Sequence, residues 1–209
     1  MQMFSLLALP LLLALTLHEL AHGWVAEKLG DSTAKDAGRL TINPLKHLDF
    51  MGTLVFVVTQ LVGWAKPVPV NPRNFRNPKQ GMAIVAAAGP MMNFIIAGIS
   101  AILLRLHDPV VGLILNYKFN WMLYIVLPAF YMINISVRIN VALAIFNFIP
   151  IPPLDGGRVL TGILKDKQAV KFSKIEPYGF IIIIVLLMSG IIGKAVFPII
   201  MTVTRLLLG

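Results

Sequence analysis

The 209-residue chain is 57% hydrophobic and only 13% charged, with a mean hydropathy of +0.82, which excludes an ordinary soluble domain. Its net charge of +9 does not indicate nucleic-acid binding, because the basic residues gather in the polar gaps between apolar runs, as they do in the cytoplasmic loops of membrane proteins. The absence of cysteine excludes disulfides and thiolate metal sites, so only nitrogen and oxygen ligands are left for a metal.

Several apolar runs reach the roughly 20 residues that a helix needs to cross a bilayer, so we expect a polytopic membrane protein. We place apolar segments at 4–26, 50–65, 80–104, 121–152 and 178–208, the last as one helix or two. The first is expected to be a retained helix, because Met1–Phe4 lacks the basic residues of a signal peptide. Residues 50–65 are short for a span and indicate a re-entrant segment, a hairpin or a short helix, and residues 105–120 indicate a short polar loop.

The polar region between the first and second core helices has a different pattern. The prolines of KPVPVNPRNFRNPK, residues 66–79, exclude a regular helix and favour extended backbone. LTIN and KPVPVN resemble short strands and predict a small membrane-associated β-hairpin or sheet that could capture an extended peptide by strand addition. The predicted fold is therefore all-α and polytopic, with about 4–6 transmembrane helices, plus this hairpin, in a single domain over residues 1–209.

The distribution of basic residues predicts a topology. Eight lysines and arginines lie between the first apolar segment and residue 80, only Arg105 and Lys118 follow the 80–104 span, and the 158–174 loop is basic again. The positive-inside rule then puts the first and third regions in the cytoplasm and 105–118 on the other side. Residues 50–65 must in that case enter and leave the membrane on the same side.

The stretch LTLHELAHGWV, residues 15–25, places three ionisable side chains inside an apolar segment, where each is costly. His18-Glu19-Leu20-Ala21-His22 follows the HExxH pattern, in which two histidines one turn apart share a helix face and can bind one zinc ion. Glu19 could then take a proton from a zinc-activated water. The alternative is two interfacial histidines beside a snorkelling glutamate, which explains less well why all three lie in one apolar span.

A catalytic zinc site needs three protein ligands and an open position. The candidates for the third ligand are His47, His107 and Asp155. Asp155 follows a long apolar helix and a proline break, and such a break is tolerated at membrane depth only where it is buried or lines a water-filled cavity. It could equally be a turn aspartate paired with Arg158.

The motifs together resemble a known family. HELAHGWVAEKLGD, AGRLTINPLKHLDFMGTL, WAKPVPVNPRNFRNP, AAAGPMMNF and NVALAIFNFIPIPPLDGGRV, in this order, are similar to the site-2 protease family of intramembrane zinc metalloproteases, peptidase family M50. The match is to small prokaryotic members without a PDZ domain. The resemblance implies one Zn²⁺ per chain held by His18, His22 and Asp155, Glu19 as the catalytic base, and an active site that opens to the cytoplasmic side.

Three further residues are candidates for the site. Asn93 in GPMMN and Asn147 in FNFIP are amides that could donate to an oxyanion or hold the substrate backbone, and the resemblance suggests substrate-handling roles for both. The alternative for both is an interhelical hydrogen bond. His47 in NPLKHLD could lie behind the ligands or beside the substrate, although an interfacial amphipathic role is more usual for such a histidine.

The expected function is intramembrane zinc endopeptidase activity on transmembrane segments of membrane proteins, in the lipid bilayer of the cell membrane. The alternatives are a zinc-binding membrane protein without activity and a channel or transporter that uses the intramembrane polar residues. A channel is disfavoured because no inverted repeat is evident, and a silent site would have no need of Glu19. The substrate, its cleavage site and the oligomeric state are left open by the sequence.

Overall fold

The computed structural model describes the backbone of residues 2–59 and 65–209 and the side chains of residues 6–55 and 65–209. Its long helices are α1 (Gln2–Lys28), α4 (Pro78–Leu104), α6 (Leu123–Asn147) and α10 (Ile191–Leu208). Shorter helices are α2 (Thr33–Asp36), α3 (Phe50–Thr59), α5 (His107–Asn116), α7 (Asp155–Ile163), α8 (Asp166–Ser173) and α9 (Glu176–Met188). Single 3₁₀ turns lie at Pro44–Lys46, Pro72–Asn74 and Asn120–Met122.

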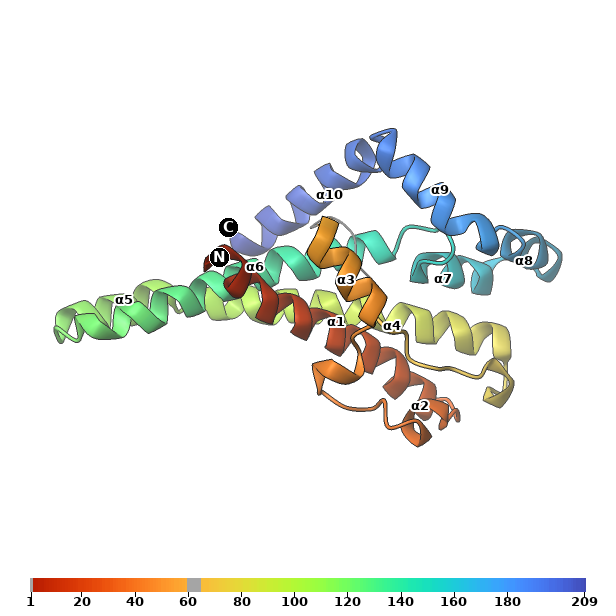
Figure 1. Cartoon of the computed structure of the whole chain (residues 1–209), viewed down its shortest axis with the longest axis horizontal. Helices are drawn as coiled ribbons and strands as arrows, with labels where there is room; N and C mark the ends of the chain where they lie inside the picture. The colour runs from red at the N-terminus through yellow and green to blue at the C-terminus, as the bar shows by residue number, and fades with distance from the viewer. Residues whose placement is uncertain (1, 60–64) are drawn as a thin grey trace.

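Helices α4 and α6 run side by side through the molecule, and α1 packs across both (Figure 1). Helix α7 packs against α4, whereas α9 and α10 form an arch whose second arm contacts α6 (Figure 1). The α4–α6 interface is built from the small or β-branched residues Ala97, Ala101, Val137 and Val141, all of which are buried. Small side chains let helix backbones approach closely, which in a membrane replaces the hydrophobic effect as the source of packing.

Among the residues that the structure describes, four helical segments are long and apolar enough to cross a membrane by length and composition. They are Leu6–Lys28, Pro78–Asn116, Asn120–Asn147 and Ile191–Leu208, and α9 is a shorter apolar helix. Many large apolar side chains on these helices are exposed, as expected for faces that contact lipid. The predicted all-α, polytopic class is therefore confirmed.

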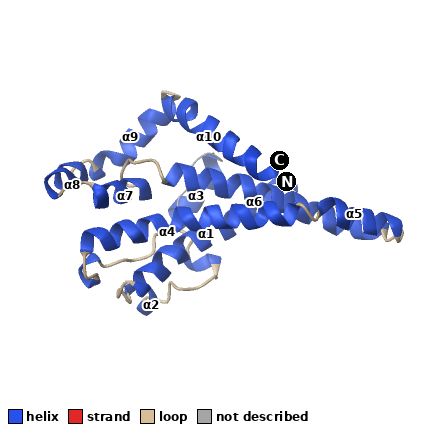
Figure 2. Ribbon diagram, turned by 180° about the vertical axis from the view of Figure 1, so that it is seen from behind, coloured by secondary structure: helices blue, strands red, loops and turns tan. Residues whose placement is uncertain are grey.

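The predicted β-hairpin between the first and second core helices is wrong. No strand occurs among the described residues (Figure 2), and the pairing found there is an isolated antiparallel bridge between Leu48 and Ala65. Prolines 67 and 69 carry no N–H, which removes the ladder donors from one edge of the segment. At the other edge, the Arg39 guanidinium donates to the carbonyl of Lys66 at 2.7 Å and so takes an acceptor that a partner strand would need.

The segments expected at 105–120, 178–208 and 50–65 can also be compared with the structure. The prediction of a polar loop at 105–120 is wrong, because most of this segment forms α5. Helix α5 continues in nearly the same direction as α4 (Figure 1). The last apolar segment forms two helices, because Gly190 adopts a left-handed backbone (φ 73°) between α9 and α10. The segment expected at 50–65 contains α3, and its residues 60–64 lie outside the described part of the chain.

Candidate metal centre

The two histidines of the HExxH pattern lie on the face of α1 that packs against α4. His18 and His22 are buried, with 6% and 9% of their surface exposed, and their Nε2 atoms are 3.1 Å apart. Positions four residues apart lie one above the other on a helix, which is why both rings reach the same point.

Asp155 reaches that point from a distant part of the sequence. Helix α6 ends at Asn147, prolines 150, 152 and 153 prevent it from continuing, and α7 begins at Asp155 itself. Asp155 Oδ2 lies 3.1 Å from His18 Nε2 and 3.4 Å from His22 Nε2. Gly156 permits this return, because a Cβ atom there would overlap the carbonyl group of Phe148.

The spacing of these three atoms suits zinc. A tetrahedral zinc with bonds of about 2.0–2.1 Å has neighbouring ligand atoms about 3.3 Å apart, and the three separations are 3.1, 3.1 and 3.4 Å. The donor types, two imidazole nitrogens and a carboxylate oxygen, form a three-ligand set that leaves a fourth position open, as catalytic zinc sites do.

The hydrogen bonds behind the histidines fix which ring nitrogen faces the centre. His18 Nδ1–H donates to Asn93 Oδ1 at 2.6 Å, and His22 Nδ1–H donates to the backbone carbonyl of Val85 at 2.7 Å. In the neutral rings both Nε2 atoms then present lone pairs to each other and to the Asp155 carboxylate. Three lone-pair atoms this close repel one another unless a proton or a metal ion lies among them, and partners on the other ring nitrogen are usual for metal-binding histidines.

Asn93 belongs to a buried polar chain between helices. Its Nδ2 group donates to Asn140 Oδ1 on α6 at 2.8 Å and to the backbone carbonyl of Ala14 on α1 at 3.3 Å. Asn140 in turn donates to the backbone carbonyl of Ser136 at 2.9 Å. Asn93 and Asn140 are completely buried, so these bonds fix the amide orientation that His18 requires.

Gly89 gives α4 the room to pass the histidines. A Cβ atom at this position would lie 2.6 Å from both Cε1 and Nε2 of His18, and would also overlap the ring of His22. Such contacts are too short for any real side chain. The glycine of AAAGPMMNF is therefore required by the positions of the two histidine rings as well as by helix packing.

Glu19 lines the same cavity as the three candidate ligands, and this cavity has a volume of about 350 Å³. Its Oε2 accepts a hydrogen bond from the backbone N–H of Val68 at 3.0 Å. Val68 belongs to an extended segment, residues 65–71, that we call the strap. The cavity is bounded by α1, α4, the strap, and the chain around Asp155.

The strap is fixed at both ends. At one end Arg39 holds the carbonyl of Lys66, whose N–H donates to the carbonyl of His47 at 2.8 Å. At the other end the Asn71 N–H donates to the buried carboxylate of Asp31 at 2.7 Å. The strap therefore lies over α1 at a defined position, which brings the Val68 amide to Glu19.

Asp31 is the strongest of these anchors. Besides the Asn71 N–H, its carboxylate accepts hydrogen bonds from Thr33 and from the side chain of Asn74 at 2.6 Å. Burial acts to raise the pKa of this carboxyl group, but the hydrogen bonds to its charged form outweigh burial and hold the pKa below its ordinary value.

The other site residues proposed from the sequence lie at different distances from the three candidate ligands. Asn147 lies in the cavity wall, with its amide donating to the carbonyl of Leu143 at 3.0 Å. His47 is buried in the loop that anchors the strap, with Nε2–H donating to the carbonyl of Thr41 at 2.8 Å. His107 pairs with Asp108 beside a separate cavity, so Asp155 is the one candidate for third ligand that lies with His18 and His22.

Several groups that contribute to the site could not be predicted from the sequence pattern. Asn140 is visible as a polar residue in an apolar span, but nothing in its spacing pairs it with Asn93. Asp31 resembles an ordinary turn residue after α1. The Val68 N–H is a backbone group, and no side-chain pattern could have identified it.

Comparisons with known proteins agree with the motifs. Residues 110–190 match the model of peptidase family M50. The chain is 38% identical over 193 residues to the protein named "Putative zinc metalloprotease YwhC" of Bacillus subtilis, covering 92% of this chain and 84% of that protein. The chain belongs to peptidase family M50. The resemblance to the site-2 protease family is thereby confirmed.

Two more distant relatives have similar names. "Putative zinc metalloprotease Rip2" of Mycolicibacterium smegmatis is 26% identical, over 94% of this chain and 72% of that protein. "Zinc metalloprotease MJ0392" of Methanocaldococcus jannaschii is also 26% identical, over 91% of this chain but only 44% of that longer protein. No solved structure matches the chain significantly.

Proposed function

We propose that this M50 protein is an intramembrane zinc endopeptidase that hydrolyses peptide bonds in or near the transmembrane segments of membrane proteins. The observation that carries the proposal is the convergence of three ligand atoms within 3.1–3.4 Å, with Glu19 beside them in a cavity among apolar helices. The zinc metalloprotease names of the relatives support the same activity.

His18, His22 and Asp155 would hold one Zn²⁺ ion, with Asn93 and the Val85 carbonyl orienting the rings. When bound, zinc polarises the scissile carbonyl and lowers the pKa of an attacking water. The buried hydrogen bonds fix both imidazoles before the ion arrives, so little rearrangement accompanies binding.

Glu19 is the proposed general base. It accepts a proton from the attacking water and later donates it to the leaving amine, so that a neutral amine departs. The Val68 N–H donates to this carboxylate at 3.0 Å and so holds it in the cavity wall.

The two asparagines are proposed to act differently. Asn147 faces the cavity and could donate to the substrate backbone by exchanging its bond to Leu143. Asn93 is proposed to act through His18, because both ends of its amide are engaged within the helix bundle. His47 is proposed to help anchor the strap.

The substrate and its setting follow from the fold and the charges. An apolar bundle gives access to membrane-embedded polypeptides. A scissile bond must leave its helical conformation to be attacked, because the backbone hydrogen bonds and side chains of a helix shield its amides. The basic segments on both sides of the site support a cytoplasmic opening by the positive-inside rule. Glu19 in the cavity favours this function over a silent zinc protein or a transporter.

The test is cleavage of a single-span model substrate by purified protein in detergent or liposomes. Glu19→Gln is expected to keep zinc but to lose at least about 100-fold in rate, because it removes the base and no ligand. Asp155→Ala is expected to lose zinc and activity together. Glu27→Gln is the matched control, since Glu27 lies on the same helix but pairs with Lys35. Full activity in Glu19→Gln would contradict the proposal.

A further inference from the structure

The cavity at the metal centre continues into a second one. The second cavity, of about 670 Å³, shares five lining residues with the first: Pro67, Val68, Val70, Met82 and Arg158. Together they form a groove that begins at the proposed zinc ligands and runs between the strap and α7. Its far end is lined by the starts of α4 and α9 and by the end of α8.

An endopeptidase needs room for the substrate chain on both sides of the scissile bond. The groove supplies that room on one side, because an extended chain leaving the metal centre along the strap would enter the second cavity directly. The walls combine apolar contacts with polar groups, which suits a polypeptide better than an acyl chain. Apart from the residues at the metal centre, the charged side chains of the lining are Lys79, Arg158 and Glu176.

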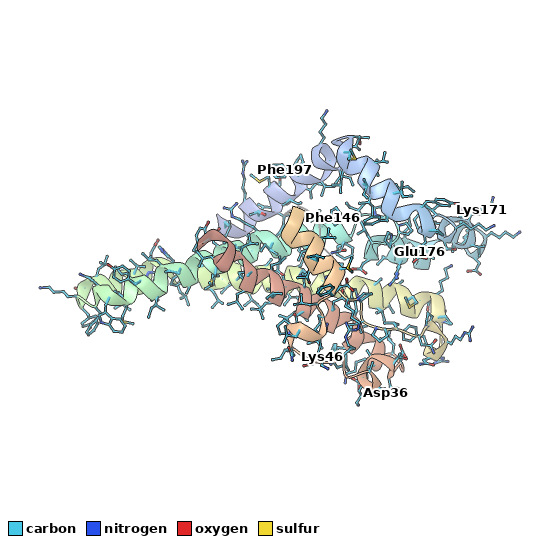
Figure 3. The ribbon with its side chains drawn as sticks, in the orientation of Figure 1. Asp36, Lys46, Phe146, Lys171, Glu176 and Phe197 are labelled. Atoms are coloured by element: carbon cyan, nitrogen blue, oxygen red, sulfur yellow. The ribbon has the colours of Figure 1, made fainter. Side chains whose placement is uncertain are left out.

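Of these three, Arg158 is in the position to contact the substrate, because it lines both cavities. Its guanidinium is 3.8 Å from the Glu176 carboxylate, and both side chains are about half exposed. Figure 3 shows Glu176 at the end of the molecule where α7, α8 and α9 meet. A pair this long and this exposed is weak, so a carboxylate in the groove could replace Glu176 as the partner of Arg158.

The other cation of the groove is already engaged. Lys79 bonds to the Asp166 carboxylate at 2.9 Å and to the carbonyl of Leu164, which ties α4 to the α7–α8 turn. The surroundings add positive charge, since α8 and its flanks carry Lys165, Lys167, Lys171 and Lys174. Basic surroundings of this kind favour the approach of acidic segments and disfavour basic ones.

We propose that Arg158 is a specificity-determining residue that selects substrates with an acidic side chain near the scissile bond, on the part of the chain that leaves the site through this groove. The inference rests on the proposed endopeptidase function. An arginine forks around a carboxylate through two parallel hydrogen bonds, so the same position would discriminate against lysine by repulsion and against asparagine by loss of charge.

The experiment places Asp, Asn or Lys in turn at each position flanking the cleavage site of one single-span substrate and compares kcat/KM. Wild type is expected to prefer Asp to Lys by about tenfold at one position, on the scale of a charged hydrogen bond. Arg158→Gln is expected to abolish this preference, and Arg158→Lys is expected to retain part of it. The double variant Arg158→Glu/Glu176→Arg is expected to weaken or reverse the preference. Glu176→Gln should strengthen it, because Arg158 then has no internal partner.

Arg105→Gln, an exposed arginine beyond the far end of α4, is the matched control and should leave the preference unchanged. Equal cleavage of all substrates by wild type, or an unchanged preference in Arg158→Gln that retains zinc, would overturn the inference while the endopeptidase function stands. If wild type cleaves none of the substrates under conditions in which it holds zinc, the proposed function itself fails, and this inference fails with it.

Discussion

At the level of single residues, the proposed metal centre depends on Gly89 as well as on the three proposed ligands. Gly89→Ala is expected to lower zinc affinity by at least roughly 10- to 100-fold, because the new Cβ would overlap the His18 and His22 rings. Competition with a zinc chelator measures this. Gly98→Ala is the matched control on the same helix, since a Cβ there meets no atom within 4 Å, and it should bind zinc as wild type does.

Substitution of Asn93 tests whether zinc binding depends on the orientation of the His18 ring. Asn93→Ala is expected to weaken zinc binding by about 10- to 100-fold, because His18 loses the acceptor that fixes its tautomer. Asn93→Asp keeps an acceptor and should retain more affinity. The same chelator competition distinguishes the variants, and wild-type affinity in Asn93→Ala would contradict the orienting role.

At the scale of elements, the strap depends on Asp31. Asp31→Ala should lower the free energy of unfolding by about 1–3 kcal/mol for each buried donor left without a partner, with Asn71 N–H the main one. Thermal unfolding measures the loss, and limited proteolysis should cut near the strap more readily. Asp36→Ala, at an exposed carboxylate on α2, is the control and should have little effect.

The contribution of Asp31 to the free energy of unfolding is expected to decrease as the pH falls. The pKa of Asp31 is lower in the folded protein than its ordinary value of 3.8, so the carboxylate stabilises the fold fully above that value. This contribution is lost as the pH falls through the lower folded-state pKa. The difference in melting temperature between wild type and Asp31→Ala should therefore be largest near neutral pH and shrink below about pH 4. A constant difference would mean that Asp31 does not act through its charge.

The elements that the sequence predicted well are those with a strong local pattern. Helices α1, α4 and α6 follow from long apolar runs, and HExxH together with the aspartate of PPLDGG identified the three atoms that converge. The strap was mistaken for a strand because its prolines favour extended backbone, whereas pairing depends on which partners its N–H and C=O groups find. Those partners, Arg39, Asp31 and Glu19, lie far away in the sequence and carry no local signal.

For the whole molecule, the distribution of basic residues predicts the sides of the membrane on which the loops lie. The chain has no cysteine, so single substitutions can be labelled without altering any native thiol. Lys118→Cys, between α5 and α6, should react with a membrane-impermeant maleimide from outside intact cells. Lys167→Cys on α8 should react only after permeabilisation. Labelling of both from the same side would contradict an odd number of crossings between them.

X-ray absorption at the zinc edge of the purified protein reports directly on the metal and its ligands. The proposed centre predicts one zinc per chain with two imidazole nitrogens at about 2.0–2.1 Å, the rest oxygen, and no sulfur. His22→Ala should remove one imidazole from the spectrum or abolish zinc binding, whereas His47→Ala and His107→Ala should leave the spectrum unchanged. A wild-type protein without zinc, or an imidazole signal that depends on His47 or His107 instead of His22, would contradict the proposed centre.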